Sequence, residues 1–240
     1  MPDWSTESVR GSARHQAFRN PNCAKDRTMS TLRDSWSSFS ADVADKYLKT
    51  YGAPSVDSKL VLTDVLKSSS GGKALRLLEL GCGNGQLAEY FTEKGLAFDY
   101  TGVDFSEPLL SAGKKAFAGM PNIRFINDDV EALTGLTGRY DFAVYSHVIE
   151  MLSSPEASLA AARRVADKIA IRFFVPPDTE HTQVELRNLD NGTADSTPRP
   201  YIRWQIGRSF YRLMLTNLGA TRVDVYRTRS TDQVHILHFD

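Results

Sequence analysis

The chain has 240 residues, of which 41% are apolar, and its 29 basic and 29 acidic side chains give a formal net charge of zero. This length is enough to bury one good core, so we expect one domain with additions rather than two full domains. A neutral chain gives no general reason to expect nucleic acid as a partner, and no apolar run approaches the roughly 18 residues of a membrane span. Cys23 and Cys82 are a poor basis for a disulfide framework, which favours a reducing, cytoplasmic setting.

The N-terminal quarter of the chain is expected to be a tail followed by helices. Residues 1–29 are polar and show no sustained period, which predicts a disordered tail. We expect 30–68 to form a helical cap, because apolar residues recur there at three- and four-residue steps. These residues are Trp36, Phe39, Val43, Tyr47 and Tyr51. A second helix is expected from Pro54, and SSSGG at 68–72 predicts a flexible linker into the main fold.

Short apolar runs then alternate with helical stretches between residues 74 and 175. Strands are expected at 75–80, 99–105, 122–128, 141–147 and 168–175. Gly95 is typical of a helix end, Ser106 is typical of a helix start, and 155–167 is rich in helix formers. Strands that alternate with helices predict βαβ units and a parallel sheet with helices on both faces.

The pattern changes after the fifth strand. The segment 176–201 is polar and has no clear period, so we expect an insertion on the substrate side of the fold. A helix is expected at about 202–218, ended by Gly219, and two alternating runs at 221–227 and 233–239 predict a closing hairpin. The expected fold is therefore a doubly wound, seven-stranded α/β sheet over 30–240, mostly parallel, with a C-terminal antiparallel hairpin.

A glycine-rich loop, ELGCGNG at 79–85, follows the first expected strand. In a doubly wound sheet this turn is the usual cofactor cradle, because glycine lets backbone N–H groups approach a ligand. A dinucleotide would require a third motif glycine where this chain has Gln86, and the acid Glu79 would repel a pyrophosphate. The loop therefore favours a cationic ligand over NAD.

Two more acids end the next two expected strands. Asp104 lies nineteen residues after Gly85 and can accept hydrogen bonds from ribose hydroxyls, which serves either cofactor. Asp129 and Val130 follow the third strand, where a carboxylate can bind an exocyclic amine and an aliphatic side chain can cover a purine. Asp128 is the alternative to Asp129, because the register is open.

Together these motifs resemble those of the class I S-adenosylmethionine-dependent methyltransferases. LLELGCGNG is similar to the glycine motif of that family, TGVDFS to its ribose-binding strand end, INDDVEAL to its adenine motif and YDFAVYSHVIEML to its fourth-strand motif. The resemblance covers about 36–240. It implies S-adenosyl-L-methionine as cofactor, S-adenosyl-L-homocysteine as product, and no metal.

The resemblance also assigns residues to the cofactor. It places Glu79 at the ammonium group, Asp104 at the ribose diol and Phe105 against the adenine. The full expected set is Glu79, Gly81, Cys82, Gly83, Gly85, Asp104, Phe105, Asp129, Val130 and Ser146. Cys82 is expected to be a small loop residue rather than a reactive thiol.

The catalytic candidates follow the fourth strand. His147 is a possible general base, because its usual pKa near 6.5 suits proton removal at neutral pH. Strand alternation would put Tyr145 and His147 on one face and Ser146 on the other, with Glu150 one helical turn beyond His147. The family often has Glu-His where this chain has Glu150 and Met151.

Substrate contacts are expected from the helical cap and the insertion, namely Tyr47, His181, Arg199 and Arg203. Between Arg199 and Arg229 the chain has seven arginines and one acid, Asp224. Two of these arginines would flank the start of the expected helix, which suits a carboxylate or phosphate on the acceptor. The alternative is that these arginines form solvated faces and edges.

The expected function is methyl transfer to an O or N atom of a small molecule, such as an anionic metabolite or natural-product intermediate. We expect no nucleic-acid or membrane partner and a monomer or homodimer. The alternatives are an NAD-dependent oxidoreductase, which lacks a hydride-site signature here, and a non-catalytic module that binds S-adenosylmethionine.

Overall fold

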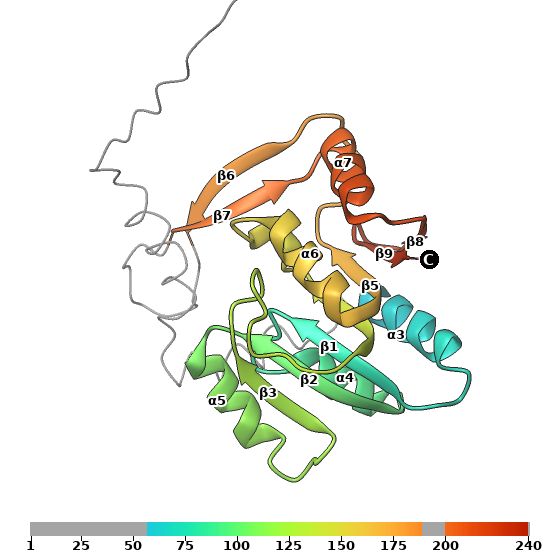
Figure 1. Ribbon diagram of the computed structural model, residues 1–240, viewed down its shortest axis with the longest axis vertical. Coiled ribbons are helices and arrows are strands. Elements are labelled where there is room, and N and C mark those ends of the chain that lie inside the picture. Colours follow the sequence, from blue (N-terminus) through green and yellow to red (C-terminus); the bar gives the residue numbers. More distant parts are fainter. Residues whose placement is uncertain (1–56, 189–199, 240) are drawn as a thin grey trace, which may run out of the picture.

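The fold is organised around a seven-stranded sheet, seen in a computed structural model that describes residues 57–188 and 200–239 (Figure 1). Its elements are α3 (Asp57–Ser70), β1 (Leu75–Leu80), α4 (Gln86–Glu93), β2 (Phe98–Asp104), α5 (Glu107–Ala116), β3 (Ile123–Asn127), β4 (Tyr140–Ser146), the short 3-10 helix η1 (Ile149–Met151), α6 (Pro155–Val165), β5 (Ala166–Phe173), β6 (Gln183–Asn188), β7 (Pro200–Gln205), α7 (Arg208–Leu218), β8 (Arg222–Arg227) and β9 (Gln233–His238). The expected tail at 1–29 and the expected helix that carries Tyr47 lie outside the described residues.

The strand order is β3-β2-β1-β4-β5-β9-β8. Strands β1 to β5 pair in parallel, whereas β9 is antiparallel to both β5 and β8. This confirms the expected sheet, including its closing hairpin. The order changes direction between β1 and β4, and in open α/β sheets such a switch point is where ligands bind.

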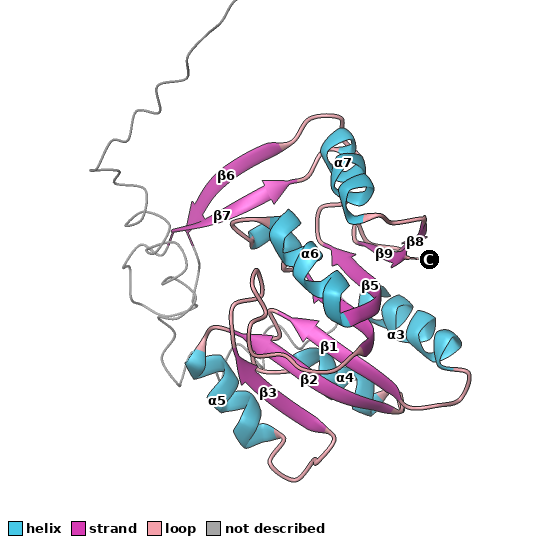
Figure 2. Cartoon of the chain, in the orientation of Figure 1, coloured by secondary structure: helices cyan, strands magenta, loops and turns pink. Residues whose placement is uncertain are grey.

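Helices cover both faces of this sheet (Figure 2). Leu62 of α3, Phe91 of α4 and Leu110 of α5 share one buried cluster on one face. Leu159 of α6 and Met214 of α7 belong to a second cluster on the other face. Because both faces are buried, the parallel strands read as nearly continuous apolar runs, which is why the sequence predicts them well.

The expected helix at 202–218 is wrong at its start. Residues up to Gln205 form β7, which pairs with β6 in a separate two-stranded antiparallel sheet, and the helix α7 begins only at Arg208. The apolar residues Ile202, Trp204 and Ile206 recur every second position, which is the period of a strand. Gly207 separates the two elements.

Gly207 packs tightly against the backbone just before β6. A Cβ at this position would lie 2.5 Å from the carbonyl carbon of His181, so only glycine fits against that backbone. Its N–H donates to Thr182 Oγ1 at 3.0 Å.

The end of the helix α3 also differs from the sequence prediction. The expected linker at 68–72 is half helical, because α3 continues to Ser70. Gly95 and Gly219 end their helices with positive φ values of 67° and 73°, as predicted.

Within the described ranges, no helix is long and apolar enough to cross a membrane.

Candidate cofactor and acceptor site

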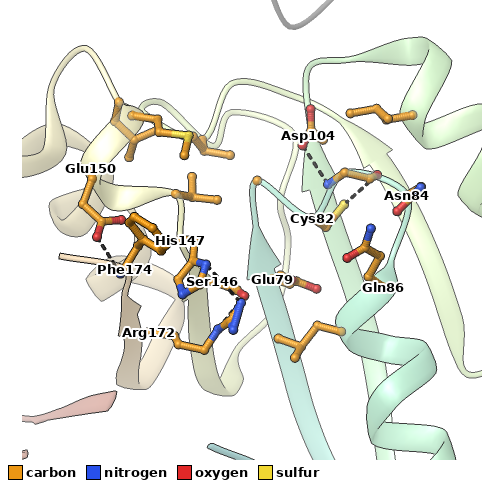
Figure 3. A pocket seen from close by; sticks show the side chains of 18 of the residues that line it. Glu79, Cys82, Asn84, Gln86, Asp104, Ser146, His147, Glu150, Arg172 and Phe174 are labelled. Carbon is orange, nitrogen blue, oxygen red and sulfur yellow. Dashed lines mark hydrogen bonds between the residues drawn. The ribbon is translucent and has the colours of Figure 1, made fainter. Parts of the chain in front are cut away.

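A cavity of about 410 Å³ opens at the carboxyl ends of β1, β2, β4 and β5 (Figure 3). It therefore lies at the switch point of the sheet. Asp104 and Cys82 lie on one side of it, Glu150, Phe174 and His147 lie on the other, and Glu79 lies between them. Cavities of this size in proteins commonly hold small ligands.

The glycine loop after β1 approaches the cavity closely. Gly81 has a φ of 72°, and a Cβ there would lie 2.6 Å from Cγ1 of Val148. Gly83 and Cys82 also line the cavity, and burial raises the pKa of the Cys82 thiol well above its usual value. Gly85 does not line it: a Cβ there would lie 2.8 Å from the Phe125 ring, so this glycine permits packing between α4 and β3.

Asp104 braces the loop and lines the cavity. Its Oδ2 accepts the Gly83 N–H at 2.8 Å, and its Oδ1 accepts the Ser106 N–H at 2.9 Å. Burial raises the pKa of this carboxyl group. The Phe105 N–H also donates to this carboxylate, and because a carboxylate can accept about four hydrogen bonds, capacity remains for a ribose hydroxyl. Phe105 lines the cavity beside it, as expected from the sequence.

Glu79 is buried at the end of β1 and lines the cavity. Its Oε2 accepts a hydrogen bond from the Tyr100 hydroxyl. Burial raises the pKa of Glu79 to about 8, although the Tyr100 hydrogen bond and the positive charges of Arg172 and Lys59 act in the opposite direction. The free protein therefore holds a neutral Glu79 near pH 7, beside two cationic side chains that also line the cavity.

Of the two residues expected to contact the adenine, one lines the cavity and the other does not. Val130 lines the cavity, but Asp129 does not. The Asp129 Oδ1 atom accepts the Glu131 N–H at 2.9 Å and so braces the turn after β3. Asp128 is also engaged, because its Oδ2 accepts the Gly135 N–H at 2.8 Å.

His147 lies in a buried polar cluster at the end of β4. The His147 Nε2 atom is 3.0 Å from Asp232 Oδ2, and its Nδ1 atom is 3.3 Å from Nη2 of Arg172. Because arginine only donates, Nδ1 accepts and Nε2 donates its hydrogen to Asp232. Arg172 also donates to Ser146 Oγ at 3.1 Å and to Ser58 Oγ at 3.1 Å. Burial lowers the pKa of His147.

This cluster corrects the expected strand alternation. His147 has a φ of 59°, so the strand ends before it. Tyr145 instead bonds Ser158 of α6 at 2.9 Å, whereas Ser146 and His147 both contact Arg172. The positive φ turns the imidazole away from the face that Tyr145 occupies.

Glu150 is buried in η1 with only 1% of its surface exposed. Its Oε1 accepts the N–H groups of Phe174 and Val175 at 2.7 and 2.9 Å. Among the residues that the structure describes, its Oε2 has no hydrogen-bond partner, and Glu150 lines the cavity. Burial raises the pKa of Glu150 to about 7. This carboxyl group is therefore fixed in place and keeps one buried oxygen without a partner among the described residues.

The expected substrate residues are only partly brought together. Arg203 lines the cavity, but from strand β7 rather than from a helix start, and its guanidinium lies 4.6 Å from the centroid of the Phe174 ring. His181 does not line the cavity. Tyr47 and Arg199 lie outside the described residues.

Five polar or aromatic residues that line the cavity were not among the expected site residues: Lys59, Asn84, Gln86, Arg172 and Phe174. The sequence could have indicated Arg172 as a functional residue, because it is a cation inside the apolar run KIAIRFFV. The sequence does not indicate Lys59, since a lysine on an amphipathic helix is normally exposed. Over the described part of the chain, no group of three His, Cys, Asp or Glu residues could hold a metal ion.

The family described as "methyltransferase domain" matches residues 77–168, which run from β1 into β5 and include the loops that line the cavity. Residues 77–168 thus match the methyltransferase family, and the fold is that of the Rossmann-like S-adenosylmethionine-dependent methyltransferases. This match and the fold together confirm the resemblance, the enzyme class and the cofactor that the sequence predicts.

Three relatives illustrate the likeness of this methyltransferase to known proteins. The putative methyltransferase YqeM of Bacillus subtilis is 36% identical over 69 residues, which cover 29% of this chain and 27% of that protein. The malonyl-[acyl-carrier protein] O-methyltransferase of Paenibacillus sp. is 27% identical over 106 residues, which cover 42% and 38% of the two chains. The matched part is thus well under half of either relative.

A solved structure extends the likeness over the whole fold. The 1,6-didemethyltoxoflavin-N1-methyltransferase of Burkholderia thailandensis, solved with that substrate and S-adenosylhomocysteine, superposes with a TM-score of 0.61. It is 18% identical to this chain, and the superposition covers 92% of this methyltransferase and 93% of the neighbour.

Proposed function

We propose that this chain transfers a methyl group from S-adenosylmethionine to an O or N atom of a small molecule. The observation that carries the proposal is a single cavity shared by two kinds of group. It joins the Gly81 loop and Asp104, which suit the cofactor, to Glu150, whose buried Oε2 has no partner among the described residues and suits an acceptor proton. The two relatives described above that are named for a substrate also act on different acceptors, through O in one case and N in the other.

The residues present fit the zwitterionic end of this cofactor. A neutral buried Glu79 can ionise beside an ammonium group, and Lys59 and Arg172 line the same cavity as cations suited to a carboxylate. Asp104 offers its remaining lone pairs to the ribose, with Phe105 and Val130 as apolar neighbours for the adenine. When bound, S-adenosylmethionine supplies an electrophilic methyl group on its sulfonium.

Glu150 is the better candidate to receive the acceptor's proton. Both ring nitrogens of His147 are already engaged, one as donor to Asp232 and one as acceptor from Arg172. Glu150 has an unpartnered oxygen and a pKa of about 7, which suits a general base at neutral pH. We therefore assign proton acceptance to Glu150 and give His147 the role of holding Arg172.

The chemistry of the loop also weighs against the two alternatives. The NAD-dependent oxidoreductase is disfavoured because Gln86, rather than glycine, begins α4. The buried acid Glu79 beside the loop would also repel a pyrophosphate. A non-catalytic binding module would not require a buried carboxylate oxygen left without a partner at the acceptor side, because such an atom costs about 1–3 kcal/mol.

The test is S-adenosylhomocysteine formation from S-adenosylmethionine over a panel of small hydroxyl and amine acceptors. We expect turnover with some panel members, and a loss of about 100-fold or more in Glu150→Gln, the range typical of a lost general base. Glu156→Gln, at an exposed position of α6, is the matched control and should retain wild-type turnover. The proposal fails if the panel contains no acceptor for a chain that nevertheless binds S-adenosylhomocysteine.

A further inference from the structure

The acceptor side of the cavity combines three groups of different chemistry. Glu150, Phe174 and Arg203 all line it, from η1, from the segment after β5 and from β7 respectively. Figure 3 shows Glu150 and Phe174 directly beside one another, with the imidazole of His147 next to the ring. We call this set the acceptor wall.

The carboxylate of the wall is rigid and incompletely bonded. The N–H groups of Phe174 and Val175 hold Oε1 of Glu150, which fixes the orientation of the carboxyl plane. Its other oxygen is buried and has no partner among the described residues. Buried polar atoms are nearly always satisfied in native proteins, so this oxygen calls for an O–H or N–H donor on a ligand.

The aromatic ring of the wall offers a flat apolar surface. Phe174 keeps 47% of its surface exposed while it lines the cavity. The His147 ring contacts it edge-on at a centroid distance of 5.5 Å. Since backbone bonds to Glu150 also hold the residue, the exposed part of the ring is fixed in place and can contact a planar ligand.

The cation of the wall is held beside that ring. The Arg203 guanidinium lies 4.6 Å from the Phe174 centroid. The Nε1–H of the neighbouring Trp204 donates to the Leu152 carbonyl at 2.8 Å, which anchors β7 on the loop after η1. A guanidinium stacked on a ring directs its N–H groups sideways, where they suit a carboxylate or phosphate.

We infer that the acceptor is a planar aromatic or heteroaromatic acid, recognised by Glu150, Phe174 and Arg203 together. Its reactive O–H or N–H donates to Oε2 of Glu150, its ring lies against Phe174, and its anionic group binds Arg203. In the transfer step the acceptor's O or N lone pair forms the new bond to the methyl carbon, the sulfur–methyl bond breaks, and the proton moves to Glu150. This inference rests on the proposed function and adds the class of substrate to it.

The probes are simple acids that differ by one group each. The three hydroxybenzoate isomers carry all three features, benzoate lacks the hydroxyl, phenol lacks the carboxylate and 4-hydroxycyclohexanecarboxylate lacks the flat ring. Each is titrated into the chain saturated with S-adenosylhomocysteine, by isothermal titration calorimetry. We expect at least one hydroxybenzoate to bind about tenfold or more tightly than each incomplete probe, as one well-placed hydrogen bond to a charged group allows.

Variants assign each preference to its side chain. Glu150→Gln should remove the preference for hydroxybenzoate over benzoate, Arg203→Met the preference for it over phenol, and Phe174→Leu the preference for it over the cyclohexane acid. Arg208→Met, an exposed arginine of α7 that does not line the cavity, is the control and should keep all three preferences.

The outcomes separate this inference from the proposed function. If wild type does not bind S-adenosylhomocysteine, the proposed function itself fails. If wild type binds it but shows no preference among the probes, or if the preferences survive in the wall variants, the acceptor wall is wrong and the proposed function stands.

Discussion

Replacing Gly81 with alanine should damage both stability and cofactor binding. The residue has a φ of 72°, which costs an ordinary L residue about 1–2 kcal/mol. The new alanine Cβ would also lie 2.6 and 2.7 Å from the two γ-carbons of Val148. Because the Cβ of Val148 is itself only 3.2 Å from the new atom, rotation of the valine side chain cannot relieve the clash. Overpacking of this kind costs about 1–3 kcal/mol. The two effects together predict a loss of about 2–5 kcal/mol.

Gly95→Ala is the matched control. Gly95 has a similar φ of 67°, but a Cβ there would meet nothing within 4 Å. It should therefore lose only about 1–2 kcal/mol, the cost of the left-handed backbone alone. Urea denaturation followed by circular dichroism gives the free energy of unfolding for both variants.

Ligand affinity provides the second readout of this pair. Val148 lines the cavity, so its displacement in Gly81→Ala should weaken S-adenosylhomocysteine binding, whereas Gly95→Ala should bind like wild type. Equal destabilisation of the two variants would refute the clash with Val148. Unchanged affinity in a folded Gly81→Ala would refute the close approach of this loop to the ligand.

Four further predictions concern ionisable groups in the cavity. Burial keeps Glu79 protonated to about pH 8 in the native state, so the free energy of unfolding should fall from pH 4.5 to 8, and Glu79→Gln should flatten that slope in urea titrations. Ligand binding at pH 7 should release a proton from Glu79, seen by calorimetry as a dependence of the binding enthalpy on the buffer, and Glu79→Gln should abolish it. The specificity constant kcat/KM should rise with pH through about pH 7 as Glu150 ionises, whereas kcat/KM of Glu150→Gln should not rise over this pH range. His147→Ala should lose about 1–3 kcal/mol of stability, because Asp232 and Arg172 lose a buried partner, yet keep that pH profile.

The sheet and the cofactor half of the site follow from local sequence signals. A buried parallel strand is a continuous apolar run, and the residues just after it necessarily meet at one edge of the sheet. For that reason Glu79, Asp104 and Ser146 could be placed at one cavity from the sequence alone. Gly85 shows the limit of this reasoning, since a motif glycine serves packing against Phe125 rather than the cavity.

The acceptor half depends on contacts between distant segments. The bond from Arg172 to Ser58 joins residues 114 positions apart, and no period in either segment indicates it. Arg203 lies on the strand β7, whereas the sequence predicts a helix there. A short run with Ile202, Trp204 and Ile206 fits the period of a helix or of a strand until its partner strand is known. The substrate side was therefore predicted least well.

The measurement that tests the central claim most directly is calorimetric titration of the folded chain with S-adenosylhomocysteine, alongside NADH. We expect saturable one-to-one binding of S-adenosylhomocysteine and none of NADH. We also expect Asp104→Ala, which removes the acceptor of the Gly83 and Ser106 N–H groups, to weaken that binding by about tenfold or more. Binding of NADH in this cavity, or no response to S-adenosylhomocysteine at millimolar concentration, would contradict the account.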